Sequence, residues 1–562
     1  MSKGRRRLRR ALIIFGVLFI VSLSLVYWYK AATDIAPPQV SADMFTLQDV
    51  SVDGDSTLHL GNNFLLKNDL GLYEMYLEGD GYERGLAHGI LCKDLIEFQE
   101  SVFIKQLKQI IPNERYLSML KYATLFFNRN MPHYIPTEYL EEIYGISKAH
   151  PDSFNFIGEK YDRVLNYHAA HDIGHTMQQY MLVGCTSFGA WDGYTKDGKI
   201  ILGRNFDFYM GEDFARNKVV SFYKPDSGHA FASVSWPGFI GAVSGLNEAG
   251  LALTINAAAG DPPMGTKMPI ALLTREILQY ASNIEEALDI CRRRETFVSE
   301  SILLASAEDG RTVIIEKSPT QTGLYESSIS RISCSNHYQS AVFSDEPNNV
   351  KNIEESDSPY RLARMNELLD QSPDLDVEHT ASILRNKEGL FNRSLGYGNQ
   401  KAINQLICHH SVIIKPEERK IWVSAPPYNL GKYVCYDLNL IFANPTAVLK
   451  QKHYYSDEFS IPEDPFVHSE SFRRMEVFRR MLPLMRFFIQ HPKENQPHET
   501  FFHLFEEYNP HWYHTQELLG DYYSAQGDEQ RAGRFYAQAL KMEIATTGER
   551  NRIVEKLESL SK

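Results

Sequence analysis

A cysteine followed by a cation and a carboxylate is the strongest chemical signal in the sequence. Cys185 starts a β-like run, and nineteen positions later the chain reads Gly-Arg-Asn-Phe-Asp, with Arg204 and Asp207. The turn signal Asp197-Gly198 lies between them and predicts an antiparallel hairpin that brings both charges beside the thiol. A cation lowers the pKa of a thiol, whereas a carboxylate holds an amine. The two charges are therefore expected to serve two different groups. A lone cysteine at a strand edge is also often only a small buried hydrophobic residue.

These residues resemble the penicillin acyltransferase-like (acyl-coenzyme A:6-aminopenicillanate acyltransferase) N-terminal-nucleophile cysteine hydrolases, a family related to the choloylglycine hydrolases. The resemblance covers about residues 69–440, and its motifs occur in the order that the family has. They are Gly81 to Gly89, Cys185 to Phe188, Asp197 to Asp207, Gly245 to Leu251 with Thr254-Ile255-Asn256, Ser335 to Tyr338, Ser358 to Arg361, and Ile407 to His409. Each motif alone is weak, but their shared order is specific.

The resemblance implies an α+β chain with a four-layer αββα fold, made as an inactive zymogen that cuts its own Gly184-Cys185 bond. Before the cut, the amide nitrogen of Cys185 cannot accept a proton. After the cut, its free α-amine, with a pKa of about 7.7 to 8.0, can act as the general base. The implied activity is hydrolysis of an amide, or acyl transfer, through a thioester on Cys185. Both reactions share the acyl-enzyme, so the sequence does not separate them.

The resemblance also implies roles for the other site residues. Asp207 orients the α-amine, and Arg204 favours the thiolate or binds an oxyanion or carboxylate of the substrate. Asn256 donates to the tetrahedral oxyanion, a role worth about 3 to 4 kcal/mol per donor. Asn336 matches a second asparagine of the family, and Arg361 matches an arginine that supports the pocket and the amine. The implied partner is a small-molecule N-acyl or acyl-thioester substrate.

Several of these residues also fit purely structural roles. Asn256 and Asn336 are typical of turns at strand ends, and Arg361 of an exposed helix cation. Glu83 and Arg84 fit an ion pair at a helix start.

Histidines and metals are not expected to take part. His88 and His337 are interpreted as structural hydrogen-bond donors, because a nucleophile with its own amine needs no histidine base. The 19 histidines include no HExxH motif and no tight His/Asp cluster. No metal site and no cofactor is therefore predicted.

Two other functions remain open. A papain-like protease would use Cys185 with a separate histidine, but its cysteine should begin a helix, whereas residues 186–191 are β-like. A non-catalytic, membrane-tethered binding scaffold predicts no self-cleavage and no effect of replacing Cys185. An internal N-terminus beginning Cys-Thr-Ser would favour the self-processing enzyme over both.

The N-terminal region predicts a membrane anchor. Residues 11–29 carry no charge and are long enough to cross a hydrocarbon layer of about 30 Å. Tyr27 to Tyr29 resemble an interfacial belt, and six cations precede the apolar run: Lys3, Arg5, Arg6, Arg7, Arg9 and Arg10. The positive-inside rule then predicts a single-pass protein with a cytoplasmic N-terminus and an extracytoplasmic catalytic part. A signal peptide cleaved near Ala31-Ala32 is the less favoured alternative, followed by a buried core helix.

Changes in composition and in the spacing of apolar residues along the chain predict the domain organisation. Polar and proline-bearing residues give way to long helical patterns, then to short β-branched and aromatic runs with turn signals, and finally to helical patterns again. The expected segments are a basic cytoplasmic segment (1–10), a signal-anchor (11–29), a tether (30–67), a helix-rich pro-segment (68–184), a catalytic fragment (185–450) and a helical extension (463–562).

One helix pair of the extension resembles a tetratricopeptide repeat. The small and large positions of that pattern are occupied by Leu519, Gly520, Tyr523, Gly527, Ala532, Tyr536 and Ala539. A stack needs about three repeats to be stable, so a helical appendage packed on the main domain is favoured over a free peptide-binding solenoid. A protein partner at these helices is a further expectation.

Composition limits the remaining function classes. The 562 residues carry 58 basic and 71 acidic side chains, a net charge of −13, which disfavours nucleic acid as a partner. A hydrophobic fraction of 43% with 23% charged residues is ordinary for a folded chain. The six cysteines include no CxxC pair, so neither a zinc module nor a disulfide framework is indicated.

Overall fold

Helices and strands both contribute to the fold, as expected for the α+β class. A computed structural model of the chain describes residues 3–53, 57–111, 113–176, 184–211, 213–263, 265–446, 453–494 and 496–560. Within these stretches the strands form one sheet of 11 strands and one of 7. Residues 177–183, the end of the predicted pro-segment just before Gly184, lie outside the described residues.

The larger sheet combines strands from both sides of Cys185. Its spatial order is β1 (Ser51–Asp53), β2 (Thr57–Leu60), β3 (Asn63–Lys67), β4 (Tyr73–Gly79), β7 (Val219–Pro225), β8 (Phe231–Ser235), β9 (Ser244–Asn247), β10 (Leu251–Ala257), β11 (Glu300–Ser306), β12 (Arg311–Lys317) and β13 (Thr322–Tyr325). β4 and β7 pair in parallel, with Tyr73 opposite Val219 and Gly79 opposite Pro225. This pair joins the segment before Cys185 to the segment after it.

The smaller sheet carries the predicted hairpin. Its order is β14 (Arg331–Cys334), β5 (Thr186–Asp192), β6 (Gly198–Phe206), β15 (His410–Lys415), β16 (Lys420–Ser424), β17 (Tyr433–Asp437) and β18 (Ser456–Ile461). β5 and β6 pair antiparallel around the Asp197-Gly198 turn.

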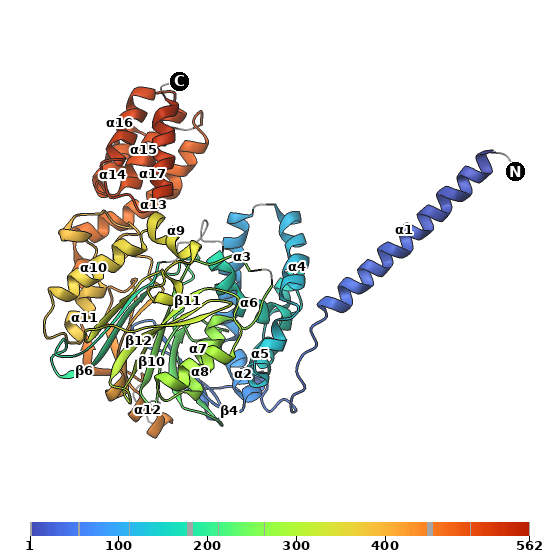
Figure 1. Cartoon of the computed structure of the whole chain (residues 1–562), viewed down its shortest axis with the longest axis horizontal. Helices are drawn as coiled ribbons and strands as arrows, with labels where there is room; N and C mark the ends of the chain where they lie inside the picture. Colours follow the sequence, from blue (N-terminus) through green and yellow to red (C-terminus); the bar gives the residue numbers. More distant parts are fainter. Residues whose placement is uncertain are drawn as a thin grey trace.

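The two sheets share one core, and helices cover their other faces. Side chains along a strand alternate between faces. Leu303 of β11 therefore packs against the smaller sheet, in an apolar cluster that also contains Val412 of β15. Its neighbour Ile302 points to the opposite face and packs with the helices that cover the larger sheet. Ile413 of β15 packs with helices over the smaller sheet. The first helix set (Figure 1) comprises α2 (Gly81–Leu91), α3 (Lys93–Ile110), α5 (Thr137–Lys148), α6 (Lys160–Thr176), α7 (Ile270–Tyr280) and α8 (Ile284–Arg293), and the second comprises α10 (Ser358–Asp370) and α11 (Val377–Leu384).

The glycine-rich run before the site is a helix-packing motif. A Cβ atom added at Gly85 of α2 would lie 2.0 Å from the carbonyl oxygen of Glu142 in α5, so only glycine allows this approach. The close contact lets Arg84 reach the buried Glu142 carboxylate, with 2.9 Å between Nη2 and Oε2. The interpretation of Glu83 and Arg84 as an ion pair is therefore wrong. Glu83 instead completes the N-terminal capping box of α2 with Asp80.

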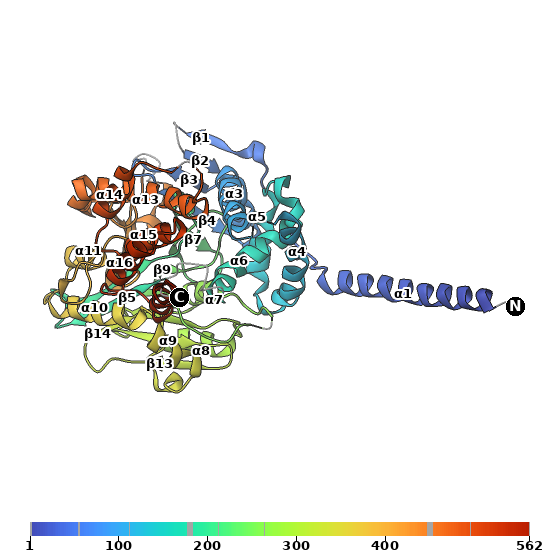
Figure 2. The ribbon, with the colours of Figure 1, turned by 90° about the horizontal axis from the view of Figure 1, so that it is seen from above.

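The N-terminal helix α1 (Lys3–Thr33) projects away from the body of the protein (Figures 1 and 2). Its segment Arg9–Thr33 has a mean hydropathy of 2.5 over its most apolar window, none of which is buried in the protein. By length and composition this segment can cross a membrane.

The C-terminal helices form a bundle at one end of the protein body (Figure 1). They are α13 (Glu470–Gln490), α14 (Glu499–Tyr508), α15 (Tyr513–Ala525), α16 (Glu529–Ala539) and α17 (Thr547–Ser559). α15 packs closely on α16 because Gly520 faces the ring of Tyr536, and a Cβ there would lie 2.4 Å from that ring. The helices also bond to the main body: Arg479 Nη1 donates to the carbonyl oxygen of Leu406 at 2.7 Å. The resemblance to a tetratricopeptide repeat stays a prediction.

The segment at 30–67 is expected to be a tether followed by one or two entry strands. The structure has three strands there, β1, β2 and β3, and Phe64 and Leu66 are buried between the sheets. The expected catalytic segment ends at residue 450, whereas β18 at 456–461 belongs to the smaller sheet. The alternation of so short a strand is hard to distinguish from polar loop sequence. The other α-helices among the described residues are α4 (Glu114–Asn128), α9 (Pro347–Glu355) and α12 (Leu438–Ala443).

Candidate active site

The β5–β6 hairpin places the candidate nucleophile beside a cation. Cys185 immediately precedes β5, and its side chain is buried. In the hairpin register Ser187 lies opposite Arg204. The Arg204 Nη2 atom consequently lies 3.6 Å from the Cys185 Sγ atom. The contact predicted from the turn and the spacing is present.

Arg204 is held between the two sheets. The side chain is fully buried, and its Nη2 atom also donates to the carbonyl oxygen of Ile255 in β10 at 2.6 Å. Its Nη1 atom donates to Ser244 Oγ in β9 at 2.6 Å. The guanidinium of the smaller sheet is thus bonded to two strands of the larger one. This arrangement fixes both sheets around the thiol.

Burial dominates the acidity of the thiol. The pKa of Cys185 is raised to about 11 by burial, against the lowering effect of Arg204 and Arg361. Arg204 lowers this pKa in the expected direction, but a fully buried thiolate loses more solvation than the guanidinium restores, so the pKa of the intact chain rises overall. The thiol is protonated at neutral pH.

Asp207 is a buried carboxylate directly after β6. Its main-chain oxygen accepts a hydrogen bond from the Gly184 amide at 3.0 Å, which ties it to the residue before the nucleophile. Burial raises the pKa of its carboxyl to about 7, although Arg361, Arg204 and the Cys408 thiol lower it. Among the described residues, no N–H or O–H group donates to either carboxylate oxygen.

Asn256 lies near the end of β10 and faces the hairpin. Its Oδ1 atom accepts from Ser187 Oγ at 3.1 Å, and its Nδ2 atom donates to the carbonyl oxygen of Cys334 at 3.3 Å. The side chain is fully buried. In the intact chain its amide group is therefore engaged with the protein.

Arg361 and Asn336 complete the site from the opposite side. Arg361, near the start of α10, is 1% exposed, so the alternative of a surface cation is wrong. Its Nη1 atom donates to the Cys185 carbonyl oxygen at 2.7 Å, and its Nη2 atom to Asn336 Oδ1 at 2.8 Å. Asn336 Nδ2 donates to the carbonyl oxygen of Ala257 at 2.8 Å. Arg204, Asp207 and Arg361 thus contact residues 184 and 185 directly, whereas Asn336 bonds to Arg361 and Asn256 bonds to Ser187.

Gln405 is a site residue that the sequence did not reveal. Its Nε2 atom donates to the carbonyl oxygen of Gly184 at 3.3 Å, which is the carbonyl of the Gly184-Cys185 peptide. A Cβ at Gly184 would lie 2.3 Å from this nitrogen, so the glycine makes room for the contact. Gln405 lies outside every motif of the resemblance and reaches the site from a loop before β15. Only its distance from Gly184 in space identifies it.

The two histidines singled out in the sequence have structural partners. His88 Nε2 accepts from the Gly238 amide at 3.0 Å, so it is an acceptor there and not the expected donor. His337 Nδ1 lies 2.7 Å from Ser358 Oγ. Burial lowers the pKa of both to about 4, which keeps them neutral at pH 7. Among the described residues no group of three or more His, Cys, Asp or Glu side chains is placed to hold a metal.

None of the six predicted site residues lines the cavity of about 680 Å³, but neighbours of two of them do. Its wall includes Ser299 and Tyr338, and the loop that follows β10 supplies much of the rest. Ser299 precedes Glu300, which pairs with Ala257, and Tyr338 follows Asn336 by two residues. The cavity therefore adjoins the strand ends that carry both asparagines.

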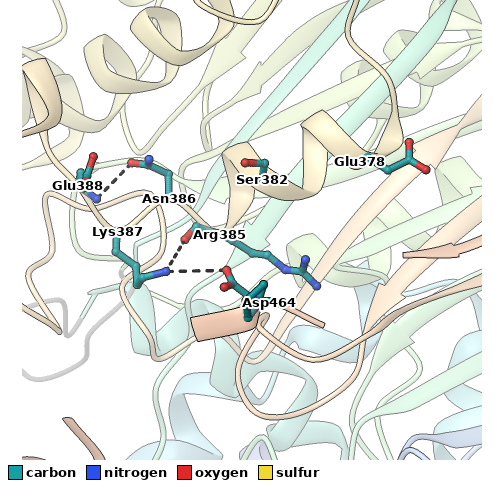
Figure 3. A pocket seen from close by; sticks show the side chains of 8 residues that line it. Glu378, Ser382, Arg385, Asn386, Lys387, Glu388 and Asp464 are labelled. Atoms are coloured by element: carbon teal, nitrogen blue, oxygen red, sulfur yellow. Dashed lines mark hydrogen bonds and ion pairs between the residues drawn. The ribbon is translucent and has the colours of Figure 1, made fainter. Parts of the chain in front are cut away.

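A second, smaller hollow is unrelated to the thiol. It has a volume of about 430 Å³ and is lined mainly by charged and polar side chains, including Arg385, Lys387 and Asp464 (Figure 3). Lys387 Nζ lies 3.8 Å from Asp464 Oδ2, so its charge is already paired. None of the six predicted site residues lines it.

Comparison with known proteins confirms the family resemblance. Residues 194–427 match the family model of the acyl-coenzyme A:6-aminopenicillanic acid acyl-transferases. This stretch contains five of the six predicted site residues and begins after Cys185.

Three relatives match similar lengths of the chain. A protein of Archaeoglobus fulgidus described as uncharacterized is 30% identical over 240 residues, which are 40% of this chain and 39% of that protein. Protein dcd1B of Dictyostelium discoideum is 24% identical over 235 residues, 38% of this chain and 44% of its own length. Protein dcd1A of the same organism is 24% identical over 248 residues, 40% and 52% respectively. The matches span about half or less of these relatives.

Solved structures give weaker similarities. The N-acylethanolamine-hydrolyzing acid amidase ortholog of Caenorhabditis elegans has a TM-score of 0.31 and 16% identity, covering 42% of this chain and 93% of that one. A mutant conjugated bile acid hydrolase of Clostridium perfringens has a TM-score of 0.31 and 14% identity, covering 46% and 93%. Penicillin V acylase of Agrobacterium tumefaciens has a TM-score of 0.28 and 11% identity, covering 45% and 86%.

Proposed function

We propose that this protein is a self-processing N-terminal-nucleophile cysteine enzyme that hydrolyses or transfers the acyl group of N-acyl substrates through a thioester on Cys185. Asp207 carries the proposal. A buried carboxylate without an N–H or O–H donor is costly, and this one is bonded through its main chain to Gly184. An α-amine released at Cys185 would supply the missing donor.

The proposed cut starts within the intact chain. The Cys185 sulfur attacks the Gly184 carbonyl carbon, and Gln405 donates to the oxygen on which negative charge develops. The C–N bond breaks, the thiol proton passes to the departing nitrogen, and the Gly184 acyl group is left on sulfur as a thioester. Water then hydrolyses the thioester, which gives a carboxylate at Gly184 and a free α-amine and thiol at Cys185.

The mature site then acts on a separate substrate. The α-amine takes the thiol proton as sulfur attacks the substrate carbonyl, and it returns that proton to the leaving amine. Asp207 holds the amine, while Arg204, Asn256, Asn336 and Arg361 stabilise the charges that form. Water or an acceptor amine finally takes the acyl group from the thioester. The cavity beside Ser299 and Tyr338 is the proposed substrate site.

The fold and the cellular location of the protein belong to the same proposal. The helix, sheet, sheet, helix order corresponds to the four-layer αββα fold, and α1 is a signal-anchor that leaves the N-terminus in the cytoplasm and the catalytic part outside it. The C-terminal helices form an appendage that can dock a protein partner. A papain-like mechanism has less support because Cys185 precedes a strand and its thiol contacts Arg204, with no histidine bonded to it among the described residues.

Mass spectrometry of the purified protein tests the proposal. We expect two fragments, 1–184 and 185–562, with the larger one beginning Cys-Thr-Ser. Turnover of N-acyl compounds should rise in parallel with the cut. An uncut chain with full activity would contradict the proposal.

Replacing Gln405 should slow the cut and leave later turnover largely unchanged. Gln405→Met keeps the volume but removes the donor to the Gly184 oxygen, so we expect processing to slow on the order of 100-fold. The measurement is the cleaved fraction against time, followed by turnover per cleaved molecule. The matched control is Gln371→Met at the exposed end of α10, which should process at the normal rate. Equal processing rates in the two variants would show that Gln405 has no part in the cut.

A further inference from the structure

One side of α4 is apolar and uncovered. Tyr116, Met119 and Tyr122 are 55%, 66% and 52% exposed, and Ala123 beside them is also exposed. Residues spaced three and four apart share a helix face, so these side chains form one stripe, the α4 stripe. Leu117 on the other side of α4 is buried. The helix is therefore docked on the protein by one face and presents the other outward.

The aromatic end of α1 contacts one end of this stripe, at Tyr122. Tyr29 Oη donates to the carbonyl oxygen of Tyr122 at 2.7 Å, and the two rings are 6.1 Å apart. Trp28 and Tyr29 also contact the half-buried Phe126, with ring centroids 5.9 and 6.4 Å apart. The apolar surface of α1 is thus continuous with the α4 stripe.

The direction of α1 indicates what covers the stripe. Figures 1 and 2 show that α1 leaves the body on the side of α4 and contacts no other part of it along most of its length. The most apolar window of its 25-residue span has no buried part within the protein, so it needs hydrocarbon around it. A bilayer crossed by α1 begins where Trp28 and Tyr29 lie, because these residue types favour the membrane interface. That level coincides with the α4 stripe.

We propose that the α4 stripe lies in the interfacial layer of the bilayer that α1 crosses, and that lipid is its occupant. The proposal rests on the membrane anchor of the proposed function. Tyr116, Tyr122 and Phe126 suit this layer because their rings are apolar with, in the tyrosines, a polar tip. Phe156 is 44% exposed close by, since its carbonyl oxygen accepts from Lys121 Nζ of α4 at 3.3 Å. The protein would then hold a fixed orientation on the membrane and not hang from a free tether.

A fluorescent probe on the stripe tests the proposal. All six native cysteines are buried, so a cysteine introduced at an exposed position can be labelled selectively in the intact Cys185→Ala chain. Met119→Cys carries an environment-sensitive nitrobenzoxadiazole label on the stripe. The control is Leu440→Cys on α12, which is 69% exposed. Both full-length chains are reconstituted into phosphatidylcholine vesicles, with and without nitroxide-labelled lipid.

We expect the label at position 119 to emit at shorter wavelength than the label at 440, and nitroxide lipid to quench it at least about two-fold more. Equal emission and equal quenching at the two positions would overturn the proposal. Emission that shifts to shorter wavelength as the amount of protein per vesicle rises, without quenching by nitroxide lipid, would also overturn the proposal. That result would indicate that a second copy of the chain covers the stripe. Vesicle flotation separates the causes: a chain that does not float refutes the anchor itself, whereas a floating chain with a solvated label refutes only the stripe.

Discussion

A Cys185→Ala chain is expected to be recovered as one uncut polypeptide without measurable turnover of N-acyl compounds. The substitution removes the sulfur that attacks the Gly184 carbonyl, so the α-amine is never released. It therefore eliminates nucleophile and general base together, and we expect a loss on the order of 10⁴-fold or more. Intact mass and turnover of an N-acyl panel are the two measurements. The fold should survive, because alanine is smaller than cysteine and the Arg204 guanidinium keeps its bonds to Ser244 and Ile255.

The matched control for this experiment is another buried cysteine. Cys435 lies in β17 and packs against the helices over the smaller sheet, outside the contacts of the site. Cys435→Ala should be cut and should turn over substrate like the unaltered chain. A Cys185→Ala chain that still yields an N-terminus at residue 185 would rule out the proposed nucleophile.

Replacing Asp207 should have opposite effects on stability and on activity. The carboxyl has an ordinary pKa of 3.8, and burial raises this pKa to about 7 in the intact fold. Between these values the folded chain holds a proton that the unfolded chain has lost. The free energy of unfolding therefore falls as the pH rises from about 4 to about 7, and it stays lower above that range. Asp207→Asn cannot ionise and should escape this loss.

We expect Asp207→Asn, in the uncut Cys185→Ala chain, to be more stable at pH 8 by a few kcal/mol at most, and by little at pH 4. Denaturant unfolding at the two pH values measures the difference. In the otherwise unaltered chain the same substitution should reduce turnover about 100-fold or more, because the α-amine loses its anionic acceptor and asparagine offers only a neutral oxygen. Asp289→Asn on the exposed side of α8 is the control and should change neither property. A stability gain that is the same at both pH values would refute the assignment of a buried, ionising Asp207.

The hairpin part of the site could be predicted from the sequence because its contacts are local. The Asp197-Gly198 turn fixes the register, and the two-residue period of a strand then places Arg204 next to Cys185. A layered α+β class also follows from the sequence, since strand-like and helical patterns occur in separate blocks. The four-layer order is implied only by the family resemblance. Asn336 and Arg361 were identified only through the family resemblance, as no spacing rule links them to residue 185.

The features of the site that could not be predicted from the sequence depend on contacts between residues far apart in the chain. Gln405 approaches Gly184 across more than two hundred residues of chain, from a loop without a motif. The pKa of Cys185 depends on complete burial, which outweighs a cation that the sequence did place correctly. The role of Arg84 likewise depends on α2 and α5 approaching through Gly85, a contact that the helix pattern alone does not specify.

The parallel pairing of β4 with β7 has a consequence for the mature enzyme. A cut at Gly184 leaves these neighbouring strands on two separate polypeptides, although their hydrogen bonds keep one sheet intact. Folding of a single chain is a first-order process. Reassembly of two denatured fragments is second-order, because the fragments diffuse away from each other and must meet again. With the proposed cut, one gene would produce two associated polypeptides that reassemble only slowly once separated, and the cut protein would be protected by a slow unfolding rate and not by a reversible equilibrium.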